Sequence, residues 1–517
     1  MCQVDEEYNG LLESPVASSA TKKCNKCKET TAALVLKPGE SLCRGCFKEH
    51  FVHKFRAMLG KNRIIFPGEK VLLAVSGGSS SCAMLNQVQE GLGQNAHKKL
   101  RFKPGIVYID EGCLLGQSTE KRQKTMAQIN SLFKMTGFPH HIIPLEMVLN
   151  LPPSVLEPVH LATDDPAGSY KEAVDHFMQS SPVHSVDPRV DRSELSALTD
   201  ATNPQLIAEA QTQTLQELFS RVKTLTAKED LLHTLRRHLL VSTARTEGYS
   251  KLMLGENCTR LAVKLLANIA LGRGAQLAVD TAFCDPRYGD IVAVKPMRDY
   301  TAKEISLYNY MWNVPYVFIP SLETKTADKS SIQRLTESFV VKLQVDFPST
   351  VSTIYRTGEK LQTASVTEDI ERAPLKCLFC MCTLDTALGE TSAFQATLIS
   401  EQLSNVGTTP MQASLRPDTQ TKCGAPCDQQ DGEEHCQAQA VCCSHKGGDS
   451  MNLESLLCYS CQQTVKDMTS VEFLPQYIMS EAQRRNRRSE KKSQIRHEIS
   501  EFLLTEDGDS PSIKADS

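Results

Sequence analysis

The stretch KVLLAVSGGSSS, residues 70–81, decides the fold of this chain. Its continuous apolar run ends in a pair of glycines, which is typical of a buried parallel strand that leads into a phosphate-binding turn. Residues 82–92 have the pattern of the helix that follows such a turn. Two glycines let the backbone approach a polyphosphate, and the helix N-terminus adds partial positive charge. The candidate nucleotide-binding loop comprises Ser76, Gly77, Gly78, Ser79, Ser80 and Ser81.

A bare Gly-Gly-Ser string is more typical of a linker than of a ligand site, but its flanking strand and helix favour an anion-binding turn. Similar apolar runs predict strands at 105–112, 140–146 and 251–257, and helical spacing predicts helices at 47–59, 117–136 and 260–271. Strands that alternate with helices form βαβ units. We therefore expect an α/β fold with a mostly parallel sheet and helices on both faces.

Cysteine pairs flank this α/β region. Two Cys-x-x-Cys pairs near the N-terminus offer four thiolates to one tetrahedral zinc ion, and two further pairs near the other end repeat the pattern across 77 intervening residues. The predicted metal ligands are Cys24, Cys27, Cys43 and Cys46 in the first set, and Cys377, Cys380, Cys458 and Cys461 in the second. Four thiolates saturate the ion, so we expect structural Zn²⁺ in two zinc ribbons. A further metal, or free thiols in a flexible insertion, stay open as interpretations of Cys423, Cys427, Cys436, Cys442 and Cys443 with His435 and His445.

Basic residues concentrate at two places. Residues 22–63 hold eleven Lys or Arg against three Glu, a local charge of +8 in a chain whose net charge is -4. Such a composition indicates a surface that faces nucleic acid. The candidate nucleic-acid-binding residues are Lys22, Lys23, Lys26, Lys28, Arg44, Lys48, Lys54 and Arg56. Residues 484–496 form a second cluster, with seven basic residues and one acid, for which a solvated helix end is the alternative.

Composition limits the compartment. The chain is 40% hydrophobic and 23% charged, and no stretch approaches the roughly 20 consecutive apolar residues of a membrane span. Residues 1–15 have acidic side chains where a secretory signal has basic ones. We therefore expect a cytoplasmic protein without a membrane partner, whose 19 cysteines are not disulfides.

Taken together, the motifs resemble a known enzyme branch. Ser-Gly-Gly at 76–78, Tyr-Ile-Asp-Glu-Gly at 108–112, Leu-Gly-Glu-Asn at 254–257 and the flanking Cys-x-x-Cys pairs resemble the tRNA 2-thiolation branch of the PP-loop ATP pyrophosphatases. The resemblance covers residues 20–480 and implies a PP-loop (adenine nucleotide alpha hydrolase-like) domain. It also implies a heterodimer with a catalytic PP-loop paralogue that binds tRNA of the Lys, Glu and Gln type. In that complex ATP adenylates the wobble uridine, and sulfur from a thiocarboxylated ubiquitin-related modifier replaces the activated oxygen, which yields 5-methoxycarbonylmethyl-2-thiouridine.

Three departures from the active branch predict that this chain is a non-catalytic subunit without catalytic residues of its own. The active loop is Ser-Gly-Gly-Lys-Asp-Ser, whereas Ser79 and Ser80 replace the phosphate-neutralising Lys and the Asp that contacts magnesium. The active Gly-His-Asn-Ala-Asp-Asp string is replaced at 255–260 by Gly-Glu-Asn-Cys-Thr-Arg. No cysteine occurs from 114 to 257, where active enzymes carry Cys-x-x-Cys. ATP is then used by the complex, and its binding by this chain is doubtful.

The predicted organisation has six parts. The first three are a flexible N-terminus 1–20, a four-cysteine zinc ribbon and helix 21–60, and a degenerate PP-loop domain 61–320 with a mobile insertion 151–202. The last three are a helical extension 321–376, a C-terminal zinc ribbon 377–480 with a flexible insertion 383–450, and a basic segment with an acidic tail 481–517. Two other functions stay open. An autonomous PP-loop ATP-dependent RNA-modifying enzyme would release pyrophosphate by itself, and a zinc scaffold without an RNA partner would fail to bind tRNA at any salt concentration.

Overall fold

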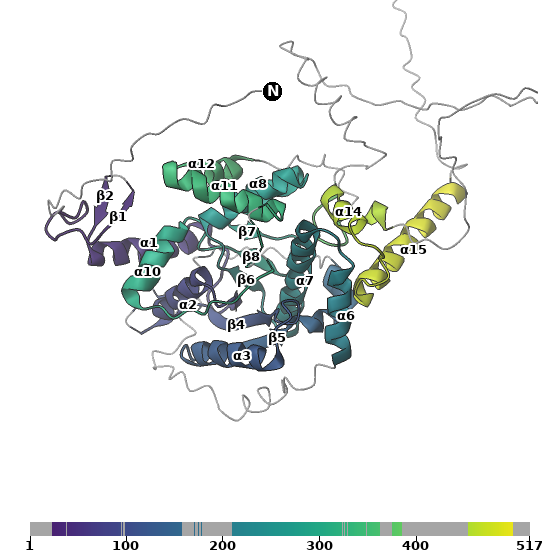
Figure 1. The fold of residues 1–517 in the computed structure, drawn as a ribbon, viewed down its shortest axis with the longest axis horizontal. Coiled ribbons are helices and arrows are strands. Elements are labelled where there is room, and N and C mark those ends of the chain that lie inside the picture. The colour runs from purple at the N-terminus through teal and green to yellow at the C-terminus, as the bar shows by residue number, and fades with distance from the viewer. Residues whose placement is uncertain are drawn as a thin grey trace, which may run out of the picture. The chain divides into compact units, whose positions relative to one another are not determined.

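The computed structural model describes residues 23–157, 209–361, 375–384 and 453–499 (Figure 1). Eight positions within these ranges are not described: 38, 95, 97, 98, 323, 325, 328 and 348. Residues 170, 174 and 177 are described in addition. Contacts divide the chain into two compact units, Met1–Asp385 with Leu456–Ser517, and Thr386–Ser455. The description below concerns the first unit. Lys22, the predicted N-terminus 1–20 and the cysteines and histidines between 423 and 445 lie outside the described residues.

A six-stranded sheet in the order β5-β4-β3-β6-β8-β7 forms the centre of the first unit. Its first five strands are parallel, and β7 pairs with β8 in the antiparallel sense. The strands are β3 (Lys70–Ala74), β4 (Lys103–Asp110), β5 (His140–Pro144), β6 (Lys251–Leu254), β7 (Cys284–Asp285) and β8 (Val292–Val294). This architecture confirms the predicted α/β class with a mostly parallel sheet.

Both faces of the sheet are covered, as the apolar run at β3 predicts. Successive strand residues point to opposite faces. Val71 and Leu73 belong to a core cluster, and Leu72 between them is also fully buried. On the face of Val71 and Leu73 lie α1 (Arg44–Asn62), α2 (Ser79–Leu92), α3 (Thr119–Lys134) and α10 (Ala302–Trp312). Helix α7 (Leu225–Thr246) also contacts the sheet, at β6.

The N-terminal ribbon is joined to this core by α1. Strands β1 (Leu34–Lys37) and β2 (Glu40–Leu42) form an antiparallel pair that leads into the helix. Three phenylalanines one turn apart, Phe47, Phe51 and Phe55, are each at most 1% exposed. The ring of Phe51 stacks on Tyr308 of α10, with centroids 4.0 Å apart. Helix α1 is therefore a core helix, with one face buried along its length.

The remaining helices form two groups. Helices α11 (Ile332–Asp346) and α12 (Thr350–Lys360) pack on α8 (Cys258–Ala270). The other group contains α14 (Tyr459–Lys466), which contacts α7, and α15 (Gln476–Glu498), which contacts the 3-10 helices η1 and η2. The other elements are α6 (Glu209–Ser220), α9 (Leu277–Thr281), η1 (Leu145–Asn150), η2 (Pro153–Leu156), η4 (Gly274–Gln276) and η5 (Glu454–Leu456). No helix in the described part of the chain has the length and apolar character needed to cross a membrane.

Candidate nucleotide loop and metal centres

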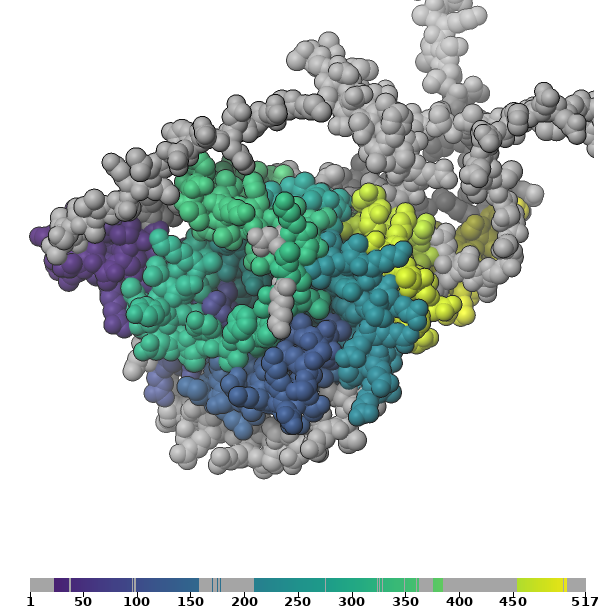
Figure 2. Space-filling view, in the orientation of Figure 1, coloured from purple at the N-terminus to yellow at the C-terminus, as the bar shows by residue number. Residues whose placement is uncertain are grey.

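The Ser-Gly-Gly turn lies at the carboxyl end of β3, where the sequence predicts it. Gly77 has φ +80°, and a Cβ there would lie 2.9 Å from a methyl carbon of Ile129 and another of Ile319. Only glycine fits this position. The backbone NH of Val317 donates a 2.9 Å hydrogen bond to the carbonyl of Gly77, so the segment after α10 packs directly on the loop. Figure 2 shows the green surface, which belongs to the chain from about residue 300 to 360, beside the purple surface of the N-terminal ribbon and helix.

The loop contacts the end of β6 across the point where ligands bind in related sheets. The chain adds β4 and β5 on one side of β3 and β6 and β8 on the other, so the topological switch point lies between β3 and β6. There the hydroxyl of Ser80 donates a 2.6 Å hydrogen bond to the carbonyl of Gly255. A Cβ on Gly255 would lie 2.8 Å from the Cα of Ser81. The two loops are therefore in direct contact.

Other polar groups of the loop are also engaged within the protein. The hydroxyl of Ser81 donates to the carbonyl of Gly78 at 3.0 Å and lies 3.3 Å from the hydroxyl of Ser76. The side-chain amide of Asn309, from α10, donates to the carbonyl of Ser79 at 2.9 Å. Gly78 caps α2 without a side-chain hydrogen bond. The predicted loop residues are thus brought together, and the hydroxyls of Ser76, Ser80 and Ser81 contact one another or neighbouring backbone.

The acidic residues after β4 form an internal ion-pair network. Arg122 of α3 donates from Nε to the Asp110 carboxylate at 2.7 Å and from Nη1 to the Glu146 carboxylate at 2.7 Å. Glu146 is fully buried, and the Asp110 side chain is 4% exposed. Glu111 is paired with Arg236 of α7. These carboxylates are balanced by arginines of the chain itself.

Glu256 stands where the active branch has His, and it faces two lysines. Its carboxylate lies 3.4 Å from Lys264 Nζ and 3.8 Å from Lys295 Nζ. Burial disfavours the ionised carboxylate, but Lys264 and Lys295 together hold the pKa of Glu256 below its ordinary value. Lys295 is fully buried, and burial lowers its pKa to about 8 despite the attraction of Glu256. A partly buried cluster of one carboxylate and two lysines therefore occupies this position.

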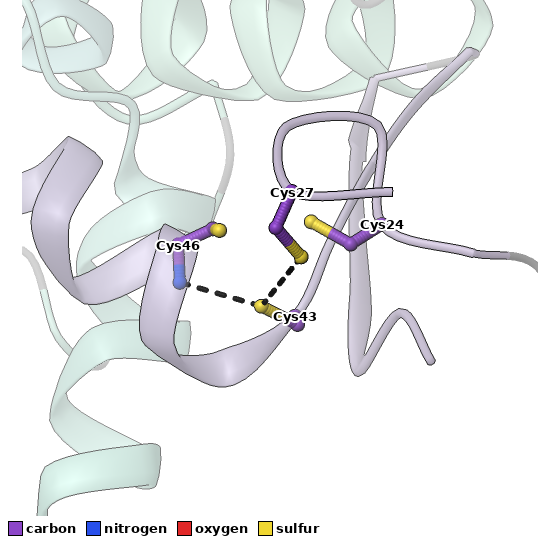
Figure 3. A group of neighbouring side chains, drawn as sticks. All are labelled: Cys24, Cys27, Cys43 and Cys46. Carbon is purple, nitrogen blue, oxygen red and sulfur yellow. Dashed lines mark hydrogen bonds between the residues drawn. The ribbon is translucent and has the colours of Figure 1, made fainter. Parts of the chain in front are cut away.

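The first cysteine set converges at the start of α1 (Figure 3). The sulfur atoms of Cys24, Cys27, Cys43 and Cys46 all lie within 4.8 Å of one another. Cys27 Sγ and Cys43 Sγ are 4.0 Å apart, and Cys43 also caps α1 by accepting from the Cys46 backbone NH at 3.4 Å. Thiolates around one tetrahedral zinc ion lie about 3.8 Å apart, given Zn–S bonds of about 2.3 Å. The four residues fit a single metal ion.

The second set converges in the same way, although 77 residues separate its halves. Its four sulfur atoms, from Cys377, Cys380, Cys458 and Cys461, also lie within 4.8 Å of one another. Cys380 Sγ is 3.6 Å from Cys458 Sγ. A fifth cysteine, Cys382, is buried beside them with its sulfur 3.1 Å from that of Cys380. The sequence analysis missed Cys382, although its spacing from the Cys-x-x-Cys pair, Cys377-x-x-Cys380-x-Cys382, is visible in the sequence.

The predicted tRNA-binding residues divide into two groups. Lys23, Lys26 and Lys28 are exposed on the ribbon, where Lys26 pairs with Glu49 at 2.9 Å. Those on α1 contact the core instead. The side chain of Lys54 is 22% exposed, pairs with Glu304 at 2.9 Å and lies 4.7 Å from the ring centre of Tyr300.

Three other basic residues of α1 are engaged with the protein as well. Lys48 pairs with Glu90 at 3.3 Å. Arg44 donates to the Met311 carbonyl and lies 5.5 Å from the ring centre of Trp312. Arg56 is half-buried. The basic residues of α1 therefore serve packing as well as surface charge.

The chain thus combines a mostly parallel α/β sheet, a Ser-Gly-Gly turn at its switch point and two four-cysteine sites. The family Cytoplasmic tRNA 2-thiolation protein 2 matches residues 331–463. The protein of that name from Danio rerio is 52% identical, over 98% of this chain and 100% of its own length. The one from Homo sapiens is 45% identical, over 98% of this chain and 99% of its own length. The chain belongs to the cytoplasmic tRNA 2-thiolation protein 2 family.

Solved structures also resemble the chain. The U34-tRNA thiolase NcsA from Methanococcus maripaludis, described with its [4Fe-4S] cluster, superposes over 70% of this chain and 97% of its own, with 16% sequence identity and a TM-score of 0.43.

Proposed function

We propose that this chain is a non-catalytic subunit of a cytoplasmic complex that 2-thiolates the wobble uridine of tRNA. It acts in a heterodimer with a catalytic PP-loop paralogue, cytoplasmic tRNA 2-thiolation protein 1. That paralogue carries out ATP-dependent activation and accepts sulfur from the ubiquitin-related modifier. The names of the relatives, which include both the compartment and the reaction, support this assignment.

The observation that carries the non-catalytic assignment is the bond from Ser80 to the Gly255 carbonyl. In the active branch this position is an Asp, which cannot donate a hydrogen bond when it is ionised. The Lys position, Ser79, brings no cation, and its carbonyl is bound by Asn309. Phosphoryl chemistry depends on positioned cations and metal ions. A loop in which the hydroxyls of Ser76, Ser80 and Ser81 bind other groups of the protein supports a structural role.

Zinc is the metal that we assign to both cysteine sets. Each set offers four thiolates with sulfur spacing that suits one tetrahedral ion, and no coordination position remains for a substrate. The zinc ions would hold the two ribbons in shape, and every chemical step would belong to the paralogue. The exposed lysines of the first ribbon, Lys23, Lys26 and Lys28, would then contact tRNA phosphates.

Pyrophosphate release tests the assignment. The purified chain alone, given ATP and tRNA, should release none above the rate of a blank, whereas the copurified complex should release it. Turnover by the chain alone, in a preparation that mass spectrometry shows to be free of the paralogue, would favour the autonomous enzyme instead.

A further inference from the structure

Helix α15 has a buried half and an exposed half. Near its start Tyr477, Ile478 and Ala482 are at most 1% exposed. Arg484 and Arg485 both bind the carboxylate of Glu481, whose side chain is 1% exposed. From residue 487 to residue 499 every side chain whose exposure is described is exposed. The first half thus fixes the helix to the protein, and the described side chains of the second half are exposed; Figure 1 shows α15 extending away from the sheet.

The exposed half carries basic groups that are not used internally. Arg487, Arg488, Lys491 and Lys492 lie within two turns, and the one acid among them is Glu490. None of the four has an ion-pair partner among the described residues, whereas Lys26, Lys48 and Lys54 of the N-terminal module each have one. From residue 487 to residue 494 the helix is polar all round, and such a stretch gains little from packing. Its charges remain available to an external anion.

These cations share one side of the helix. Ser480, Gln483, Arg484, Arg487, Arg488 and Lys491 line a shallow hollow. At about 1.5 Å of rise per residue, Arg487 and Lys491 lie about 6 Å apart along the axis, which suits contact with neighbouring phosphates of one nucleic-acid strand. The sequence has no apolar residue from 483 to 494, so the basic stretch itself offers no apolar anchor to a folded protein partner, and the exposed Ile495 and Ile499 lie beyond it. Charge complementarity therefore favours a phosphate backbone.

We propose that the exposed half of α15 is an RNA-binding surface that grips the phosphate backbone of the tRNA, in addition to the ribbon lysines. The proposal rests on the proposed function, which supplies tRNA as the ligand. Arginine and lysine side chains without base-specific geometry bind through counterion release and fix orientation rather than sequence. The surface therefore binds tRNAs alike and leaves their selection to other parts of the complex.

The test compares two triple charge reversals in the full-length chain, purified with its partner. The first variant, Arg487→Glu, Arg488→Glu and Lys491→Glu, reverses the charge of the α15 surface. Lys121→Glu, Lys124→Glu and Lys134→Glu change the same number of exposed charges on α3 and serve as the control. Binding of a transcribed tRNA with a wobble uridine is measured at several salt concentrations. A Gln version of the α15 triple variant repeats the measurement without reversed charge, and zinc content and thermal melting report folding.

The α15 variant should weaken tRNA binding at least about tenfold at low salt and lower the salt slope by about one for each phosphate that the helix no longer neutralises, whereas the α3 control changes neither. Equal affinity and slope for the α15 variant and the unsubstituted complex would overturn the inference. So would normal tRNA binding with loss of an acidic protein from the complex. Failure of the unsubstituted complex to bind tRNA would instead overturn the proposed function.

Discussion

The hydroxyl of Ser80 donates a 2.6 Å hydrogen bond to the carbonyl oxygen of Gly255, and this bond joins the carboxyl ends of two adjacent parallel strands. In a nucleotide-binding sheet the same crevice holds the ligand. Here the loop after β3 and the loop after β6 bind each other. The substitution of the active Asp by Ser is therefore a structural change as well as a chemical loss.

Ser80→Asp should destabilise the chain. An ionised carboxylate would face the Gly255 carbonyl without a proton to donate, which costs about 1–3 kcal/mol of unfolding free energy, whereas Ser80→Ala loses about 1 kcal/mol. Urea unfolding of both variants measures the difference. The double variant Ser79→Lys, Ser80→Asp should gain no pyrophosphate release. An aspartate variant as stable as the unsubstituted chain would show that the crevice still accepts the active sequence.

Glu256→Gln should lower stability by about 2 kcal/mol at pH 7, because it leaves Lys264 and Lys295 without their carboxylate. The pKa of Glu256 is lower in the folded chain than its ordinary value of about 4.3, so its stabilisation is present above that value and is lost as the pH falls. The gap between the two proteins should therefore be constant above about pH 5 and shrink between about pH 5 and about pH 3. Urea midpoints at both pH values provide the measurement, with the exposed Glu472→Gln as a control. A gap that widens on acidification would contradict the assigned pairing.

The zinc content of cysteine variants should distinguish the metal ligands from Cys382, the thiol beside the second site. Cys24→Ser and Cys377→Ser should each remove about one equivalent of zinc per chain, because each breaks a four-thiolate site. Cys382→Ser should leave the zinc content unchanged, since Cys380 already supplies the fourth thiolate of the tetrahedral site. Plasma mass spectrometry of the purified variants gives the answer. Loss of zinc from the Cys382 variant would make Cys382 the ligand, and iron in the unsubstituted chain would refute zinc.

The ribbon lysines should contribute to tRNA binding. Changing Lys22, Lys23, Lys26 and Lys28 to Glu reverses four charges without altering a cysteine, so the affinity for tRNA should fall and its salt dependence should flatten. Filter binding at several salt concentrations measures both. If neither changes while zinc content and heterodimer formation stay normal, the ribbon is not an RNA surface.

Local patterns predicted most of the fold because the necessary information lies close together in the sequence. The apolar run of β3, its glycine pair and the start of α2 span only residues 70–81. The predicted grouping of the cysteines into two sets of four matches the structure. Strands β7 and β8 went unpredicted because they have two and three residues, too few for a period to appear. Their existence depends on pairing with β6 and with each other.

Long-range partners could not be predicted from the sequence. The helical pattern of 47–59 identified the apolar stripe of α1, but Lys54 meets Glu304, which lies 250 residues away along the chain. The bond from Ser80 to Gly255 likewise joins residues 175 positions apart. The net charge summed over residues 22–63 includes side chains, such as Lys54, whose charge is balanced by an acid elsewhere in the chain. For that reason the sequence favoured the N-terminal module, and the structure draws attention to α15.

The measurement that tests the central claim most directly is the 2-thiouridine content of tRNA from cells that lack this chain and are complemented with either of two versions of it. Without the chain, 2-thiouridine should disappear. The unsubstituted chain and the variant Ser76→Ala, Ser81→Ala, at equal protein level, should both restore it fully, because the loop takes no part in the chemistry. Normal 2-thiouridine without the chain, or none with a folded double variant that still binds its partner, would contradict the account.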